Sequence, residues 1–249
     1  MDLAGKRILV TGGARGIGRA VVEEALAAGA QAAVWALNPA SIEEVRTEVP
    51  GVVWADAVDV GQAEAVEAAS SRLVEELGGL DILVNNAGYT LTSPFLDEDL
   101  AYWHRVVETN FWGVVHTTRS FLPSMRERGT GSIVNVVSDA GRVGMAGEAV
   151  YAGAKGGVVA FSKSIAQEMA RYQVRVNCVS PGPTQTRILA MNSEEENAEK
   201  LIEKMIRRIP LRRIATPQEV AHAVLFLACD DASHITGQVL SVSGGLTMV

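Results

Sequence analysis

A tyrosine and a lysine four residues apart are the clearest candidates for proton transfer in this sequence. Tyr151 and Lys155 lie in the run Glu148-Ala149-Val150-Tyr151-Ala152-Gly153-Ala154-Lys155. Residues i and i+4 of a helix share one face. A neighbouring ammonium favours the phenolate and lowers the phenol pKa from its ordinary value of about 10, as general acid–base catalysis near neutral pH requires. Because such pairs also arise by chance on helices, their neighbours decide the interpretation.

Further polar side chains follow apolar runs that predict strands. Ser138 ends the run 132–137, and a hydroxyl there can donate to a carbonyl oxygen. Asn85-Asn86-Ala87-Gly88 follows the run 81–84 and fits either a wall beside a bound cofactor or a plain turn. Asn110 lies between apolar neighbours in a predicted helix, where it is either a satisfied core amide or part of a proton relay.

A glycine-rich run indicates a phosphate-binding turn. Thr11-Gly12-Gly13-Ala14-Arg15-Gly16-Ile17-Gly18 follows the apolar run 8–10 directly and leads into a helical pattern. Glycines here permit a tight turn, let backbone N–H groups approach a pyrophosphate and let the helix pack closely on a sheet. A bare turn would explain the glycines alone, but a strand before and a helix after favour dinucleotide binding. The spacing of the first two glycines differs from G-x-G-x-x-G.

The end of the second predicted strand bears on the choice of dinucleotide. An acidic side chain there would accept from the adenosine 2′-OH and repel a 2′-phosphate. The sequence has Ala36 at this place, and Arg15 in the glycine turn is able to pair with a phosphate. The pattern favours NADP over NAD, although a solvated Arg15 and a packing role for Ala36 are the alternative.

These candidates must be positioned by alternating strands and helices. The apolar runs predict strands at 7–11, 31–36, 52–57, 81–84, 131–137, 174–179 and 238–242, and helices at 16–29, 41–48, 61–77, 101–127, 150–171 and 217–229. This alternation predicts an α/β fold, a doubly wound parallel sheet of about seven strands with helices on both faces. Nothing divides the chain, so residues 1–249 are expected to form one domain. A polar insert at about 187–209 reads as a packed surface helix or a mobile lid over the substrate.

The motifs together resemble the short-chain dehydrogenase/reductase family along essentially the whole chain. Thr11–Gly18 fits its nucleotide turn, Asp59-Val60 its adenine-contacting pair and Asn85–Gly88 its strand-four motif. The set Asn110, Ser138, Tyr151 and Lys155 fits its catalytic tetrad, and Pro181-Gly182-Pro183-Thr184-Gln185-Thr186 fits its nicotinamide-side loop.

The resemblance implies hydride transfer between a nicotinamide and a secondary alcohol or ketone. It implies that Tyr151 is the general acid/base, Ser138 holds the substrate oxygen, Lys155 lowers the phenol pKa and binds the nicotinamide ribose, and Asn110 anchors a water relay. The implied cofactor contacts are Gly12, Ala14, Arg15, Gly16, Ile17, Gly18, Ala36, Asp59, Val60, Asn86, Ala87, Gly88, Tyr151, Lys155, Pro181, Gly182, Thr184 and Thr186.

Two resemblances within the family disagree about the substrate. Arg15 with Ala36 resembles the NADP-using reductases of 3-oxoacyl-carrier-protein thioesters. The segments 138–144, 147–151 and 241–248 are more similar to dehydrogenases of cyclic hydroxyacyl-CoA compounds, which usually use NAD. A free cyclic or aryl ketone is a further alternative, and a nucleotide-sensing protein without catalysis is another. The expected pocket wall comprises residues 138–145, Tyr89, Leu91 and the insert, with Val143, Met145, Ile188, Leu189 and Met191 as apolar members. Arg142, Arg187, Arg207, Arg208, Arg212 and Arg213 either meet a thioester's phosphates or form a solvated face.

Composition narrows the partners. The 249 residues carry a formal net charge of −7, which argues against nucleic acid and anionic membranes and for a small molecule. Two cysteines without metal or C-x-x-C spacing, and no visible targeting segment, predict a cytoplasmic protein. The four histidines lack ligand spacing, so no metal is expected. The long apolar helices at 101–127 and 150–171 favour association, although they could be buried within a monomer. The family resemblance implies a homotetramer, with a dimer or monomer as the alternatives.

Overall fold

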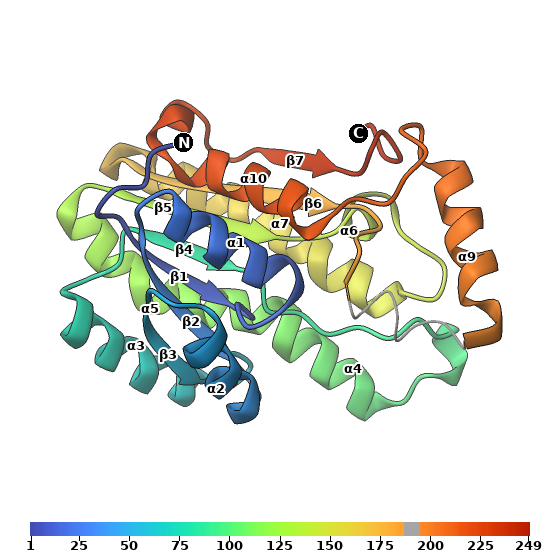
Figure 1. The fold of residues 1–249 in the computed structure, drawn as a ribbon, viewed down its shortest axis with the longest axis horizontal. Helices are drawn as coiled ribbons and strands as arrows, with labels where there is room; N and C mark the ends of the chain where they lie inside the picture. The colour runs from blue at the N-terminus through green and yellow to red at the C-terminus, as the bar shows by residue number, and fades with distance from the viewer. Residues whose placement is uncertain (187–194) are drawn as a thin grey trace.

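Seven parallel strands form one sheet in the computed structural model. The structure describes residues 1–186 and 195–249, and in the second range it describes side chains only from Ile202 onward. The sheet order is β3-β2-β1-β4-β5-β6-β7 (Figure 1). The strands are β1 (Arg7–Thr11), β2 (Gln31–Ala36), β3 (Val52–Ala57), β4 (Ile82–Asn85), β5 (Gly131–Val136), β6 (Val174–Pro181) and β7 (Val239–Val242). The order reverses between β1 and β4, which confirms the expected doubly wound fold.

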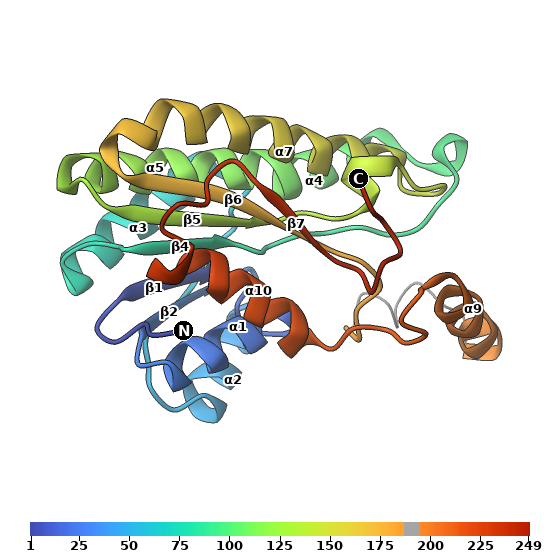
Figure 2. The same cartoon turned by 90° about the horizontal axis from the view of Figure 1, so that it is seen from above.

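Helices cover both faces of the sheet. The longer ones are α1 (Gly16–Ala27), α2 (Pro39–Glu48), α3 (Ala63–Leu77), α4 (Leu100–Val107), α5 (Gly113–Arg128), α7 (Ala149–Met169), α9 (Glu195–Arg208) and α10 (Pro217–Ala228). Short helical turns are η1 (Phe95–Asp97), α6 (Ala140–Val143), η3 (Ala170–Tyr172) and η4 (Asp230–Ala232). Seen from above, α1, α2 and α10 lie on one side of the sheet and α3, α4, α5 and α7 on the other (Figure 2).

The core follows from strands that are apolar on both faces. Leu9 and Ile8 are both fully buried although they point to opposite sides of β1, as expected for a parallel strand covered twice. On one side Ile8 packs with residues of α1 and α10, and on the other Leu9 packs with Phe121 of α5. The carboxyl ends of the strands are thereby fixed beside one another, where the candidate site residues follow.

The helix expected at 101–127 is wrong in one respect, because it is not continuous. A π-helical turn, η2 (Glu108–Trp112), separates α4 from α5 and contains Asn110. A π turn holds one more residue than an α turn. The first three strands have the predicted bounds, and the other predicted elements differ from the structure only at their ends. For example, α2 begins at Pro39 because the side chain of Asn38 caps it.

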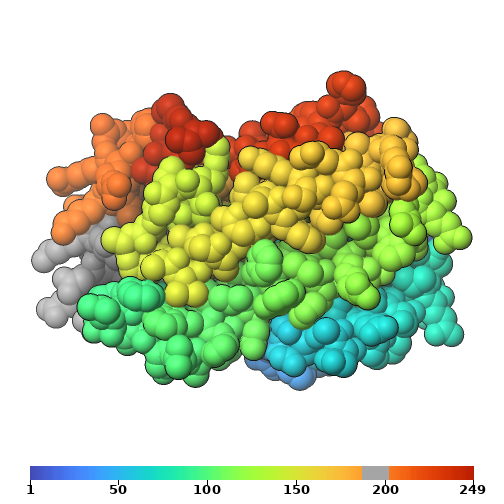
Figure 3. Space-filling view, turned by 180° about the vertical axis from the view of Figure 1, so that it is seen from behind, coloured from blue at the N-terminus to red at the C-terminus, as the bar shows by residue number. Residues whose placement is uncertain are grey.

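The back of the molecule is formed by α7 and by the segment α4–α5, which lie side by side over the sheet (Figure 3). The predicted insert contains α9, which stands at the end of the molecule next to the carboxyl edge of the sheet (Figures 1 and 2). Residues 187–194 of the insert lie outside the described residues. Within the described ranges, no helix is both long and apolar enough to cross a membrane.

Candidate active site

The glycine turn between β1 and α1 is built by close backbone approaches. Gly12 has φ +64°, and a Cβ on it would lie 2.9 Å from the Cα of Ala87. A Cβ on Gly18 would overlap the carbonyl oxygen of Gly12. These two positions therefore require glycine for tight packing of the turn against α1 and the strand-four motif.

The hydroxyl of Thr11 joins the glycine turn to the strand-four motif. Its Oγ1 accepts the backbone N–H groups of Asn86 and Ala87, each at 3.1 Å, while the Asn86 side chain donates to the carbonyls of Thr11 and Gly12. Asn86 thus positions the turn through its side chain. Thr11 lay outside the predicted site residues, although its place at the carboxyl end of β1 was a usable signal.

The first turn of α1 is open to an anion. Gly16 has φ +55°, and a Cβ there would make only ordinary contact, 3.5 Å from Cγ2 of Thr186. The first turn carries no acidic side chain, and Arg15 precedes it as an extended N-cap residue without a side-chain cap bond. The amides of the first helical turn, including that of Ile17, lack intrahelical acceptors. These residues fit a dinucleotide's pyrophosphate between the glycine turn and Thr186.

The end of β2 carries no carboxylate. Ala36 is 9% exposed and ends the strand, Leu37 is exposed, and the Asn38 side chain accepts from the amide of Ala40 as a helix cap. Arg15 is exposed on the neighbouring turn, and its guanidinium has no hydrogen bond or ion pair to any described residue. An unpaired cation without an acidic neighbour suits a ribose that carries a phosphate.

The two other predicted cofactor segments lie at strand ends. Asp59 and Val60 follow β3, where Asp59 accepts from the amide of Gly61 and the Val60 side chain is buried. Gly182 follows β6 and donates to the carbonyl of Val242, and a Cβ on it would lie 2.8 Å from that of Ser243.

Buried Thr184 continues this loop and donates to the carbonyl of Gly182 at 3.0 Å. The predicted cofactor segments thus lie at or directly after the carboxyl ends of strands, whereas the predicted cofactor residues Tyr151 and Lys155 lie on α7.

Tyr151 and Ser138 meet at the start of α7. Tyr151 occupies the first turn of α7, half-buried, and Ser138 follows β5. Burial raises the pKa of Tyr151 above its ordinary value, the carboxylate of Glu148 and the phenol of Tyr102 raise it further, and a side-chain hydrogen bond with Ser138 opposes them. Lys155 is not among the groups that shift this pKa here, so the lowering of the Tyr151 pKa by Lys155 stays a prediction.

Lys155 is buried, 3% exposed, one turn after Tyr151. Its Nζ lies 5.8 Å from the centroid of the Tyr151 ring and donates to the carbonyl oxygen of Val136 at 2.9 Å. Burial lowers the pKa of Lys155 to about 8. The site therefore holds an amine with a lowered pKa beside a phenol with a raised pKa.

Asn110 links the π turn to the segment after β4. Its side-chain amide donates to the carbonyls of Tyr89 and Val106 at 2.7 and 2.9 Å, and its Oδ1 accepts from the amide of Tyr89 at 3.4 Å. A Cβ on Gly88 would lie 3.0 Å from this Oδ1. The buried amide is thus satisfied by backbone groups while it holds Gly88 and Tyr89 next to the reacting side chains.

Three apolar residues of the expected pocket wall form an exposed apolar rim. Leu91, Val143 and Met145 are exposed, and the two segments that carry them are joined where the amide of Ser93 donates to the carbonyl of Gly147. Among the expected wall residues, Ile188, Leu189 and Met191 lie outside the described residues, as does Arg187.

Several of the arginines expected to meet a thioester's phosphates form contacts with other side chains. Arg213 pairs with Glu219 and Arg207 with Glu203, whereas Arg142 donates to Ser241. Arg208 and Arg212 are exposed, and Arg212 donates to the carbonyl of Arg207. No group of three or more potential metal ligands occurs in the part of the chain that the structure describes.

Two acidic residues beside the tetrad escaped sequence reasoning. Glu148 is half-buried three residues before Tyr151, and Asp139 is buried directly after Ser138. A sequence gives no sign that a carboxylate is buried, because Asp and Glu are mostly exposed in proteins.

Comparisons with known proteins agree with this geometry. A protein-family model described as enoyl-(acyl carrier protein) reductase matches residues 12–247. The chain is 38% identical over 250 residues to 3-oxoacyl-(acyl-carrier-protein) reductase FabG of Chlamydia pneumoniae, covering 99% of both chains. It is 37% identical to the protein of that name from Vibrio cholerae, covering 100% of both. Nodulation protein G of Rhizobium meliloti is 37% identical over 248 residues, with 100% of this chain and 99% of the relative covered.

Three findings point to one protein family. They are the glycine turn between β1 and α1, the grouping of Ser138, Tyr151 and Lys155, and relatives that match this chain over its whole length. The chain therefore belongs to the short-chain dehydrogenase/reductase family of NAD(P)-dependent oxidoreductases.

Proposed function

We propose that the protein reduces the ketone of a 3-ketoacyl thioester to the secondary alcohol, with NADPH as the preferred hydride donor. The observation that carries this proposal is the grouping of two hydroxyls and a buried amine, from Ser138, Tyr151 and Lys155, beside the glycine turn. The names of the reductases from Chlamydia pneumoniae and Vibrio cholerae support the substrate class. The apolar rim at Leu91, Val143 and Met145 suits an acyl chain.

The two hydroxyls act on the substrate oxygen. When bound, the nicotinamide supplies the hydride that the carbonyl carbon accepts. Negative charge then develops on the carbonyl oxygen, where hydroxyl donors from Ser138 and Tyr151 stabilise it. Tyr151 gives its proton to that oxygen and Ser138 keeps the oxygen in place. A pKa raised by burial suits this direction, because it keeps the phenol protonated until charge appears on the substrate.

Lys155 and Asn110 support the proton transfer. Lys155 holds the nicotinamide ribose, and its ammonium stabilises the phenolate that Tyr151 leaves behind. Asn110 anchors the backbone of Tyr89 and, in our proposal, a water chain that returns a proton to the site.

The cofactor lies along the strand ends. Gly12, Gly16 and Gly18 with the first amides of α1 hold the pyrophosphate, Asp59 and Val60 hold the adenine, and Thr184 and Thr186 hold the carboxamide. Two observations support NADP. The guanidinium of Arg15 is unpaired among the described residues, and β2 ends in Ala36, which carries no carboxylate.

The quaternary state and location belong to the same proposal. The outer face formed by α4–α5 and α7 supports a homotetramer built from such helix pairs (Figure 3). Both cysteines, Cys178 and Cys229, are free and buried, which suits a reducing cytoplasm.

A matrix of two cofactors and three substrates tests the function. The substrates are a free cyclic ketone, a 3-ketoacyl-CoA and a 3-ketoacyl carrier-protein thioester, each with NADPH and NADH, followed by the loss of nicotinamide absorbance. We expect the highest kcat/KM with NADPH and a thioester. Equal rates with the free ketone, or a preference for NADH, would overturn the corresponding half of the proposal.

Substitution of the acid tests the mechanism. Tyr151→Phe is expected to lower kcat by at least about 10²-fold, the lower end of general acid–base contributions. Tyr172→Phe is the matched control, because Tyr172 lies in η3 against Arg126 and Arg171. Near-wild-type turnover by Tyr151→Phe would remove the assignment.

A further inference from the structure

A buried carboxylate follows Ser138 directly and has no part in the mechanism above. Asp139 is 4% exposed, and its Oδ1 accepts the hydroxyl of Ser180 at 2.7 Å and that of Ser241 at 2.9 Å. Its Oδ2 is buried without a hydrogen-bond partner among the described residues. Burying a carboxylate is costly unless its hydrogen bonds compensate, and an alanine here would avoid that cost.

The two serines come from neighbouring strands. Ser180 of β6 and Ser241 of β7 are paired in register, and they lie 41 and 102 residues from Asp139 in the sequence. The backbone amide of Asp139 also donates to the carbonyl of Pro181 at 3.3 Å. One residue therefore joins the carboxyl ends of β5, β6 and β7.

The hydrogen bonds around Ser241 can run in only one direction. Arg142 donates from Nη1 to the Oγ of Ser241 at 2.5 Å, and a guanidinium has no acceptor atom. The single hydroxyl proton of Ser241 is thus available for Asp139. The hydrogen bond from Arg142 therefore orients the Ser241 hydroxyl toward the buried carboxylate.

The network connects the two halves of the reacting geometry. On one side of Asp139 is Ser138, whose Oγ accepts the amide of Ala140 at 3.2 Å. On the other side Pro181 begins the loop that leads to Thr184 and Thr186. The distance between the residue that holds the substrate oxygen and the loop beside the nicotinamide is therefore set through Asp139.

We propose that Asp139, fixed by Ser180 and Ser241, is a positioning residue that locks Ser138 to the Pro181–Thr186 loop and so aligns the substrate carbonyl with the hydride donor. This inference rests on the proposed function. Misplacement of reacting groups by about 1 Å can cost about 10²-fold in rate, so a positioning residue need not touch the substrate to matter.

The principal variant is Asp139→Ala, and its matched control is Asp81→Ala. Asp81 also joins two neighbouring strands through a carboxylate, but at the amino ends of β1 and β4, opposite the site. We expect Asp139→Ala to lower kcat by about 10- to 100-fold with little change in KM or in the NADPH Kd measured by fluorescence. Asp81→Ala is expected to lower the Tm and leave kcat of the folded protein unchanged.

Conservative variants separate charge from geometry and cover a failure of Asp139→Ala to fold. Asp139→Asn keeps an acceptor oxygen for both hydroxyls and should retain kcat within about threefold, a change worth less than about 1 kcal/mol. Ser241→Ala removes one hydrogen bond and should give an intermediate loss. In the double variant Asp139→Ala with Ser241→Ala, the loss should equal that of Asp139→Ala alone.

A readout independent of turnover follows the coupling itself. Asp139→Ala should raise amide hydrogen exchange in residues 137–140 and 181–186 together. Unchanged kcat in Asp139→Ala, or an equal kcat loss in Asp81→Ala at matched Tm, would overturn the positioning role. A wild-type protein that reduces no ketone would instead overturn the proposed function, and the two failures are thus distinguishable.

Discussion

The Nζ of Lys155 donates a hydrogen bond to the carbonyl oxygen of Val136 at 2.9 Å, so a helix ammonium is tied to the last residue of a central strand. The amine is almost fully buried, and this burial holds its pKa near 8 against an ordinary value of 10.5. The hydrogen bond thus fixes the position of the amine, and the burial lowers its pKa into a range where it titrates at mildly alkaline pH.

We expect the stability of the protein to rise with pH between about 8 and 10.5 on account of Lys155. The unfolded chain binds a proton that the folded protein has already released in this window, so folding becomes more favourable as pH increases. The free energy of unfolding of the wild type, minus that of Lys155→Met, should increase by up to roughly 3 kcal/mol across the window. Urea unfolding at several pH values measures it, and a constant difference would show that the amine is not perturbed.

Glu148 should control the pH dependence of the reaction. Its carboxylate raises the pKa of Tyr151 in addition to the larger effect of burial. Removing that charge with Glu148→Gln is expected to lower the phenol pKa, so that alcohol oxidation, which needs the phenolate, gains rate at lower pH than in the wild type. The kcat/KM profile for oxidation from pH 6 to 10 measures this shift. Glu168→Gln, at an exposed position of α7, is the control, and superimposable profiles for the two variants would contradict the effect.

Cofactor preference is expected to turn on Ala36. Ala36→Asp places a carboxylate at the end of β2, where it repels a 2′-phosphate and accepts from a 2′-OH. The ratio of kcat/KM for NADPH to that for NADH should fall at least about tenfold, which corresponds to about 1.4 kcal/mol. Arg15→Ala should weaken the binding of NADPH and leave the binding of NADH unchanged. Leu37→Asn, at the exposed next residue, serves as control. Equal losses with both cofactors would indicate a packing defect.

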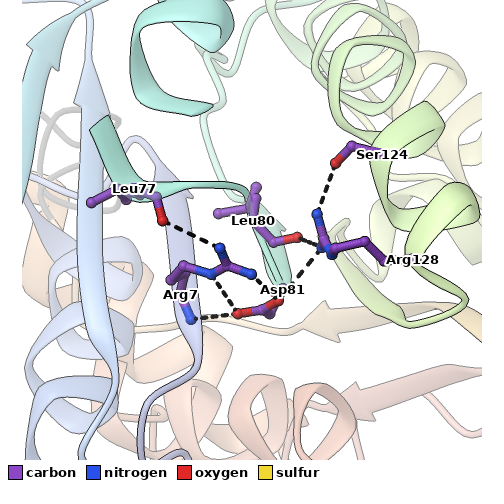
Figure 4. Close-up of polar contacts among 6 residues, drawn as sticks. All are labelled: Arg7, Leu77, Leu80, Asp81, Ser124 and Arg128. Carbon is purple, nitrogen blue, oxygen red and sulfur yellow. Dashed lines mark hydrogen bonds and ion pairs between the residues drawn. The ribbon is translucent and has the colours of Figure 1, made fainter. Parts of the chain in front are cut away.

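An ion cluster at the opposite end of the sheet should govern acid stability. Asp81 accepts from Nε and the amide of Arg7 and pairs with Arg7 at 2.8 Å, while Arg128 bridges it to the carbonyl of Leu80 (Figure 4). Burial alone would raise the pKa of Asp81, but the hydrogen bonds from Arg7 outweigh it and lower that pKa.

The stability that this carboxylate contributes is present above its ordinary pKa of about 3.9 and is lost as pH falls through its lowered value. Asp81→Asn should reduce the free energy of unfolding at pH 7 by about 2 kcal/mol, between the values for exposed and buried pairs, and flatten its decline below pH 4. Urea unfolding from pH 7 to pH 3 measures both. An unchanged acid limb would show that other carboxylates control it.

The fold was largely predictable because the strands are short apolar runs, and all except the edge strands β3 and β7 are buried on both faces of the sheet. The placement of the candidate residues was predictable for a related reason, since Ser138, Gly88 and Gly182 follow such runs closely and parallel strands end at one edge. Their roles in catalysis and cofactor binding stay predictions. Asp139 was not, because its partners Ser180 and Ser241 are distant in sequence and a lone aspartate usually signals exposure.

The protonation of Tyr151 was also beyond the sequence. The i,i+4 spacing from Tyr151 to Lys155 identifies a potential charge partner. The pKa of Tyr151 instead depends on its burial and on contacts with Glu148, Ser138 and Tyr102, which the local pattern does not reveal. The π turn at Asn110 escaped for a similar reason. Local pattern supports a continuous helix there, and only tertiary contacts on both sides of the turn require the extra residue.

That extra residue sets the rotational register between α4 and α5. If Glu108–Trp112 were wound as an ordinary α-helix with the same number of residues, α5 would be rotated by about 100° relative to α4. Thr117, which donates to Asn85 at 2.7 Å, and Phe121, whose ring lies 5.8 Å from that of Trp35, would then face away from their partners. The π turn therefore takes up one residue of chain length and keeps the side chains of α5 facing the sheet and those of α4 facing the segment after β4.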